Sequence, residues 1–295
     1  MTDLSGIFSA LLTPFDEQGR VDRTATERLV AFQVRQGVNG LYVGGSSGEA
    51  MLQSIEARSD YLDLVAQVAA HRLPLIAHVG AIATADTLRL AERAAQAGYQ
   101  AISAITPFYY AFSRGEVMDH YLALAEGSSL PLVVYNFPAR TQGFSTAELG
   151  QLLSHPNISG IKHTSSDFFQ LERLAQAHPD ALLYNGYDEM CLAGLVSGAK
   201  GAIGTTYNFM GDLYVELRAH ALAGRIEDAR KLQTLANGII EVLIEVGVMP
   251  GSKMLLAIMG VDVGVSLKPF RHLTSEERGR LEAAVRPLLA WREGP

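Results

Sequence analysis

The sequence predicts an α/β protein of the (β/α)8 TIM-barrel class with a carboxy-terminal helical extension. Three observations predict it. Short apolar runs alternate with longer helical patterns, giving eight βα units in roughly 205 residues. The runs are near-continuously apolar, as in parallel strands that are covered on both faces. Finally, "QGVNGLYVGG", "AGYQAISAIT" and "SGAKGAIGTT" each end a helix with glycine and enter a strand three residues later.

The eight expected strands lie in "GIFSALLTPF", "GLYVGG", "PLIAHVG", "AISAITPFYY", "PLVVYN", "ISGIKHT", "LLYNG" and "GAIGTT", in that order. Capping-box patterns open helices at Thr24–Glu27, Ser113–Glu116, Ser145–Glu148 and Thr274–Glu277. After "GAIGTT" no strand pattern returns, and the chain reads as helical with a break at "GVMPGSK". We therefore expect a barrel that carries the active site over residues 1–225 and a helical extension packed on it over residues 226–295.

Composition excludes several classes of protein. Of the 295 residues, 48% are hydrophobic and 19% are charged, which is ordinary for a globular enzyme. The net charge of −7 argues against a nucleic-acid binder. No apolar run is long enough to span a membrane, and the first residues do not resemble a signal peptide. The single cysteine suits a reducing compartment, so we expect a cytoplasmic protein. The eight histidines show no metal-ligand spacing, so no metal site is expected.

Lys162 is the most informative residue, because it lies within a strand that should be buried. The other four lysines, at positions 200, 231, 253 and 268, fall in turns or helical segments where we expect water to reach them. Strand alternation puts Lys162 and Thr164 on one face and His163 on the other. Desolvation lowers the pKa of a buried lysine, and a neutral amine can form a Schiff base with a carbonyl. The alternative is a lysine paired with a carboxylate of the barrel; position alone does not decide between the two.

Three further strand ends carry polar residues. Tyr135 could relay protons beside a Schiff-base lysine, or be a core tyrosine. The turn "GGSSGEA" (44–50) could bind a carboxylate through hydroxyls and free N–H groups, or could be plain capping with Ser46 and Glu49 as a box. The loop "GYDE" (186–189) could bind hydroxyls of a polyol or cap the next helix.

Taken in order, "GGSSGEA", "TPFYYAFS", "VVYNFPA", "GIKHTSSD", "YNGYDE" and "GAIGTTYN" resemble the N-acetylneuraminate lyase and dihydrodipicolinate synthase family of class I aldolases. The resemblance covers essentially the whole chain and is closer to the lyase branch, through "TPFYYAFS" and "LLYNGYDEM". It implies a reaction between pyruvate and an aldehyde, without metal or organic cofactor. It also implies a homotetramer.

The resemblance further implies a role for each site residue. Lys162 would form the Schiff base with the C2 carbonyl of a 2-keto acid. Tyr135 would move the proton during C–C cleavage, assisted by Ser47 and by Tyr109, a position that the family shares across a subunit contact. The substrate carboxylate would be held by Ser46 and Ser47, and the hydroxylated tail by Thr164, Gly186, Asp188, Glu189 and Thr205.

Two residues depart from the lyase branch. Arg140 stands where that branch has an apolar residue and the synthase branch has an arginine, so we expect it at the site entrance, where it would favour an acidic aldehyde. Met249 replaces an aromatic near the sugar tail. Four readings remain: a sialic-acid-type lyase, a synthase that condenses pyruvate with aspartate semialdehyde, a related 2-keto-3-deoxy sugar-acid aldolase or dehydratase, and a non-catalytic keto-acid sensor. The Lys162–Tyr135 pair argues against the last, since binding alone needs no imine.

Overall fold

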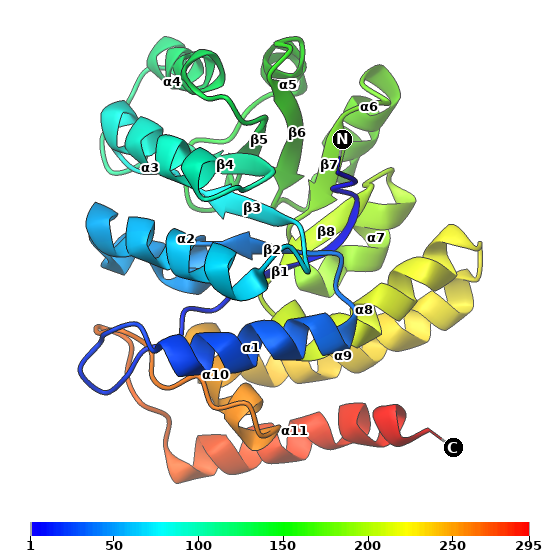
Figure 1. The fold of residues 1–295 in the computed structure, drawn as a ribbon. Helices are drawn as coiled ribbons and strands as arrows, with labels where there is room; N and C mark the ends of the chain where they lie inside the picture. Colours follow the sequence, from blue (N-terminus) through cyan, green and yellow to red (C-terminus); the bar gives the residue numbers. More distant parts are fainter. Residues whose placement is uncertain (1, 295) are drawn as a thin grey trace.

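The computed structural model describes residues 2–294. Its eight strands form one closed parallel barrel in the order β1 to β8, with β8 paired to β1 (Figure 1). The strands are β1 (Gly6–Ala10), β2 (Gly40–Val43), β3 (Leu75–His78), β4 (Ala101–Ile105), β5 (Leu132–Asn136), β6 (Ile158–His163), β7 (Leu182–Asn185) and β8 (Gly201–Gly204). Each expected strand is present, and the predicted (β/α)8 fold is confirmed.

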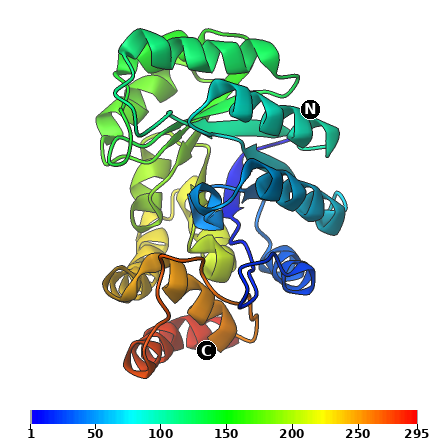
Figure 2. The same ribbon diagram turned by 90° about the vertical axis from the view of Figure 1, so that its left-hand side faces the viewer.

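Helices surround the barrel and follow the strands in turn (Figures 1 and 2). They are α1 (Arg23–Gln36), α2 (Ile55–Ala69), α3 (Thr84–Gln96), α4 (Arg114–Gly127), α5 (Thr146–Leu153), α6 (Phe168–Ala177), α7 (Cys191–Val196) and α8 (Tyr207–Leu222). Short 3-10 turns η1 (Ser46–Gly48) and η2 (Ala50–Leu52) follow β2, and η3 (Asp188–Met190) follows β7.

The local signals in the sequence explain most helix ends. Gly37, Gly98 and Gly198, at the three repeated junctions, have φ values of 72°, 86° and 99°, a conformation that glycine adopts without steric cost. The capping boxes at Ser113, Ser145 and Thr274 form as predicted. The box predicted at Thr24 is wrong: Asp22 is the N-cap of α1, and its carboxylate accepts the N–H of Ala25. An aspartate two residues upstream supplied an equally good cap.

Side chains fill the interior of the barrel, so it is a packed core rather than a pore. The interior cluster comprises Leu4, Phe8, Ala10, Tyr42, Ile76, Ala101, Val133, Tyr184 and Ile203. The larger cluster lies mainly between strands and helices. Because strand side chains alternate, polar residues near the carboxyl ends of strands can project into the barrel above this packing.

The remaining helices, α9 (Ile226–Val246), α10 (Val248–Ile258) and α11 (Ser275–Glu293), pack together against one side of the barrel (Figures 1 and 2). The break predicted in "GVMPGSK" lies at Gly247, whose φ is 105°. After α10 the chain returns to the carboxyl end of β1, where the N–H of Val265 donates to the carbonyl of Phe15 at 3.0 Å. Within residues 2–294, no helix combines the length and apolarity needed to cross a bilayer.

Candidate active site

A cavity of about 400 Å³ opens at the carboxyl ends of the strands. Nearly every predicted site residue lines it: Ser46, Ser47, Tyr135, Arg140, Lys162, Thr164, Gly186, Asp188, Glu189, Thr205 and Met249. Tyr109 does not. Its side chain lies outside this cavity and is 84% exposed, with its ring 5.0 Å from that of Tyr110. The site within one copy of the chain therefore contains all the predicted residues except Tyr109.

Lys162 projects into the barrel from the end of β6. Its Nζ lies 4.2 Å from the centre of the Tyr135 ring and 4.5 Å from that of Tyr42. Burial lowers the pKa of Lys162 to about 7, and the nearby Asp188 carboxylate partly opposes this effect. The lysine ion pairs within residues 2–294 are made by Lys231 and Lys253. The reading of Lys162 as one half of an ion pair is therefore wrong.

His163 points the other way, as strand alternation predicts. Its Nε2 lies 3.0 Å from the carbonyl oxygen of Asp167, at the start of α6. Burial lowers the pKa of this histidine as well. The amine of Lys162 thus reaches the cavity, while the imidazole of His163 lies between β6 and α6.

Tyr135 is buried beside the amine. Its ring stacks on Phe137, at an interplanar angle of 13° and a centroid separation of 5.7 Å, and meets His78 edge-on. Burial raises the pKa of Tyr135 to about 12, and the neighbouring Thr164 and Ser46 oppose the rise. The phenol is therefore protonated at neutral pH in the resting site.

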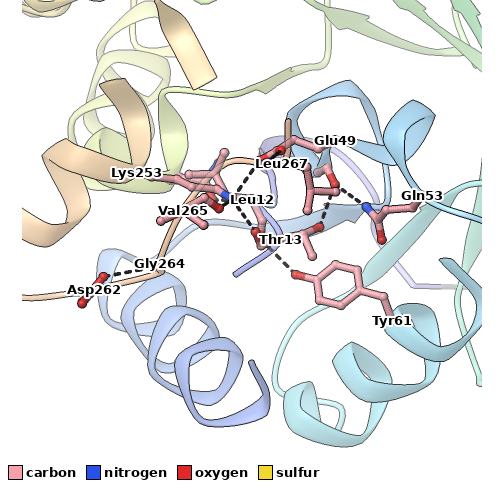
Figure 3. A network of polar contacts seen from close by, with 12 residues as sticks. Leu12, Thr13, Glu49, Gln53, Tyr61, Lys253, Asp262, Gly264, Val265 and Leu267 are labelled. Carbon is pink, nitrogen blue, oxygen red and sulfur yellow. Dashed lines mark hydrogen bonds and ion pairs between the residues drawn. The ribbon is translucent and has the colours of Figure 1, made fainter. Parts of the chain in front are cut away.

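Ser46 and Ser47 begin the turn η1 at the mouth of β2. The Ser47 hydroxyl lies 2.7 Å from that of Thr205, which follows β8, so the ends of two strands that flank β1 present hydroxyls together. The capping-box reading of Ser46 and Glu49 is wrong. The Glu49 carboxylate instead pairs with Lys253 at 2.8 Å and accepts the N–H of Leu267 at 2.6 Å (Figure 3). Lys253 is consequently buried, contrary to the expectation that water reaches it.

The loop after β7 supplies Asp188 and Glu189. Neither η3 nor α7 has a side-chain N-cap, so the capping reading of "GYDE" is wrong. One oxygen of the buried Asp188 carboxylate accepts both the N–H and the hydroxyl of Thr206, at 2.7 and 2.8 Å. Burial raises the pKa of Asp188 to about 6, against the effect of these two bonds. At Gly186, a Cβ would lie 1.9 Å from Thr164 Oγ1, so only glycine fits there.

Sequence reasoning missed the apolar wall of the cavity. It is formed by Ile240, Leu243 and Ile244 from α9, Val248 from α10, and Phe270, together with Phe137 and Tyr187 beside the strands. The spacing of Ile240, Leu243 and Ile244 indicates one face of a helix. Nothing in that spacing says which surface the face covers, because the contact joins segments distant in the sequence.

A buried lysine amine that is about half neutral at neutral pH, beside a phenol at the open end of a (β/α)8 barrel, is the arrangement of a Schiff-base-forming enzyme. The comparisons agree with this class: the chain belongs to the dihydrodipicolinate synthetase family, whose model matches residues 3–288. It is 67% identical over 290 residues to the N-acetylneuraminate lyase of Rhizobium meliloti (strain 1021), covering 98% of this chain and 97% of the relative.

Two solved structures are similar over nearly the full length. One is the catalytic lysine mutant of the Ruminococcus gnavus sialic acid aldolase, with a TM-score of 0.95, 30% identity, and coverage of 99% of each chain. The other is the N-acetylneuraminate lyase of Fusobacterium nucleatum complexed with pyruvate, with a TM-score of 0.91 and 31% identity, covering 97% of this chain and 98% of that one.

Proposed function

We propose that this chain is a Schiff-base lyase that cleaves N-acetylneuraminate to pyruvate and N-acetylmannosamine. The observation that carries the proposal is the buried Lys162 amine, whose pKa is lowered to about 7, in a cavity lined by hydroxyls and carboxylates. The 67% identity to a relative named N-acetylneuraminate lyase supports the choice of substrate.

In the first steps, the neutral Lys162 amine attacks the C2 carbonyl of the open-chain 2-keto acid. The resulting carbinolamine takes up one proton and loses water, which leaves a protonated imine whose nitrogen carries the positive charge. The Tyr135 phenol gives up its proton in the same exchange and becomes the phenolate. Ser46 and Ser47 hold the substrate carboxylate, through their hydroxyls and the N–H groups of the turn. This places C2 next to the amine and the remaining chain along the cavity.

Cleavage then breaks the C3–C4 bond. The proton of the C4 hydroxyl leaves, the C4 oxygen becomes the aldehyde oxygen, and the bonding electron pair flows into the imine to give a neutral enamine. Tyr135 takes that proton as phenolate and returns it to C3. Lys162 Nζ lies 4.2 Å from the centre of the Tyr135 ring, so the positive charge of the imine would lower the pKa of the phenol, which supports this role. Water hydrolyses the resulting imine and releases pyruvate.

The other cavity residues serve the aldehyde half. Asp188 and Glu189 accept hydrogen bonds from tail hydroxyls, while Thr164, Gly186 and Thr205 line the middle of the path. Arg140, which is exposed, and Met249 line the same cavity. The Ser47 hydroxyl, 2.7 Å from that of Thr205, assists Tyr135 in moving the proton.

We further propose a cytoplasmic homotetramer. Tyr109 is 84% exposed and has a φ of 81°, which is unusual for a tyrosine. An aromatic side chain held in this way suits a contact with another copy of the chain, where it would reach the neighbouring cavity. The single cysteine, Cys191, is buried, which fits a reducing compartment.

An assay of products tests the proposal. Purified protein is incubated with N-acetylneuraminate, with a 2-keto-3-deoxy sugar acid, and with pyruvate plus aspartate semialdehyde, and products are identified by mass. We expect pyruvate and N-acetylmannosamine in equal amounts from the first substrate, at the highest kcat/KM of the three. A higher kcat/KM for either comparison reaction would overturn the choice of substrate while leaving the Schiff-base chemistry in place.

A further inference from the structure

Glu49 and Lys253 form a buried ion pair (Figure 3). Glu49 directly follows η1, the turn that carries Ser46 and Ser47. The charged atoms of Glu49 and Lys253 are 2.8 Å apart, and their side chains are 0% and 2% exposed. Neither residue lines the cavity. A charge buried away from water is costly unless it is fully compensated, so this pair needs a structural or functional reason.

The environment of Lys253 shows that its role is to hold other groups. Besides Glu49, its ammonium donates to the carbonyls of Thr13 at 2.8 Å and Val265 at 2.5 Å, and it lies 4.6 Å from the centre of the Phe15 ring. Burial lowers the pKa of Lys253, and Glu49 opposes that shift. Three oxygens therefore lie within 2.8 Å of this ammonium, two as hydrogen-bond acceptors and one as its counter-ion, which leaves the amine no freedom to act as a second nucleophile.

Glu49 connects the buried ammonium of Lys253 to the turn that carries Ser46 and Ser47. It joins η1 to η2 with φ 57° and ψ 31°, a left-handed conformation that costs a non-glycine residue on the order of 1 kcal/mol. Its carboxylate, held by Lys253 and by the N–H of Leu267, fixes the backbone in that conformation. The residues immediately before it are Ser46, Ser47 and Gly48, which form η1.

The same turn is tied down at Gly48. Its carbonyl accepts the Thr13 hydroxyl at 2.9 Å and the Gln53 side-chain amide at 2.7 Å (Figure 3). Thr13 thus contacts both the turn and the lysine, because its hydroxyl donates to Gly48 and its carbonyl accepts from Lys253. Hydrogen bonds and one ion pair thus connect the loop after β1, the turn after β2 and the helix α10.

Helix α10 also lines the cavity, through Val248 and Met249. One helix of the extension therefore touches the substrate path at its start and holds the carboxylate turn through Lys253, one to two turns later. The extension is built into the active site, rather than being only a cover on the outside of the barrel.

We propose that Lys253, acting through Glu49, is a positioning residue that holds the Ser46–Ser47 turn in the conformation that binds the carboxylate of the 2-keto acid. This inference rests on the proposed function, because it assigns that carboxylate to the turn. It assigns to Glu49 and Lys253, which do not line the cavity, an effect on the affinity for the keto acid.

The test uses the double variant Glu49→Gln/Lys253→Met. It removes both charges at once, so no unpaired charge stays buried. Full-length protein is titrated with pyruvate, the imine is reduced with borohydride, and the adduct on Lys162 is quantified by mass. We expect the pyruvate concentration at half-maximal trapping to rise at least tenfold. The rate at saturating pyruvate and its midpoint near pH 7 should stay as in the wild type, since Lys162 is not touched.

Arg292→Met is the matched control. Arg292 pairs with Asp212 at 2.6 Å and ties α11 to α8, away from the turn. We expect this variant to lose stability without a change in half-saturation. A folded double variant with wild-type half-saturation would overturn the inference. So would an equal rise in the Arg292→Met control.

Glu49→Gln alone provides the same readout if the double variant does not fold, because it keeps the size of the side chain. Adduct formation in the wild type distinguishes a failure of the proposed function from a failure of the role assigned to Lys253. No pyruvate adduct in the wild type would sink the proposed function itself. A normal wild-type adduct with unchanged half-saturation in the variants would sink only the role of Lys253.

Discussion

The Lys162 amine lies 4.2 Å from the centre of the Tyr135 ring. Burial lowers the pKa of the amine and raises the pKa of the phenol. The amine, with a pKa lowered to about 7, is half neutral at neutral pH and ready to attack a carbonyl. The phenol, with a pKa raised to about 12, keeps its proton. In the mechanism that we propose, an imine cation replaces the amine, and the same short separation then favours the phenolate, so that the proton leaves Tyr135 only after the covalent bond has formed.

The rate of imine formation should follow the titration of Lys162. Only the neutral amine reacts, so the rate of borohydride-trapped adduct formation with pyruvate should rise with pH and level off above a midpoint near 7. An ordinary lysine would leave roughly one amine in 3,000 neutral at pH 7. The midpoint is measured by trapping the adduct with borohydride at timed intervals between pH 5 and 10. A midpoint near 10 would contradict the claim that burial lowers the pKa of Lys162.

The same lowered pKa predicts a trend in stability. Between pH 7 and 10.5 the unfolded chain binds the Lys162 proton more tightly than the folded chain does, so this group makes the free energy of unfolding rise with pH. Lys162→Met should remove that contribution. Denaturant unfolding of both proteins across this range should give a smaller rise for the variant, and equal slopes would count against the shifted pKa.

Asp188→Asn should move the midpoint of trapping below that of the wild type. The Asp188 carboxylate is the nearby negative charge that raises the pKa of Lys162, and the amide removes that charge. The substitution keeps an oxygen for the N–H of Thr206, which limits the structural change. The pH series on this variant decides the sign: an upward shift of the midpoint would show that Asp188 does not act on Lys162 as described.

Tyr135→Phe should separate imine formation from C–C cleavage. The ring and its stacking on Phe137 remain, while the proton carrier is lost. We expect kcat for N-acetylneuraminate cleavage to fall by about 10²–10⁴, with the pyruvate adduct on Lys162 still formed. Cleavage kinetics and trapping on the same preparation check both halves. An undiminished kcat would remove Tyr135 from the proton path.

Gly186→Ala should damage the site through packing alone. The added Cβ would meet Thr164 Oγ1 at 1.9 Å, so Thr164 or the loop after β7 must move, at a cost of about 1–3 kcal/mol. We expect kcat/KM to fall at least tenfold. Gly238→Ala in α9 is the control, because a Cβ there meets nothing within 4 Å. The control should keep full activity and gain about 0.5–1 kcal/mol in helix stability.

Arg140→Leu should change the ranking of aldehyde partners. Arg140 lines the cavity, where its cation would favour an acidic aldehyde and leucine would not. We expect the ratio of kcat/KM for N-acetylneuraminate cleavage to that for condensation with aspartate semialdehyde to rise at least threefold. A ratio that does not change would place Arg140 outside the specificity of the site.

The barrel and the floor of its cavity could be predicted from the sequence because both depend on local signals. Strand periodicity placed Lys162 and Thr164 inside and His163 outside, and glycine stops marked the junctions at Gly37 and Gly98. Each of these signals involves neighbours in the chain, and the strand ends of one barrel necessarily converge.

What could not be predicted depends on pairs far apart in the chain. Lys253 sits in an ordinary helical pattern, and only the return of the chain to the end of β1 brings it to Glu49 and buries both. The Ser46–Glu49 spacing fits a capping box equally well, and the distant lysine decides against it. The cavity wall from Ile240 to Phe270 is missed for the same reason.

The most direct test of the central claim is reduction with borohydride in the presence of pyruvate, followed by peptide mass mapping. The account predicts one adduct per chain, on Lys162, which is absent without pyruvate and absent in Lys162→Met. An adduct on any other lysine, or none at all in active protein, would contradict it.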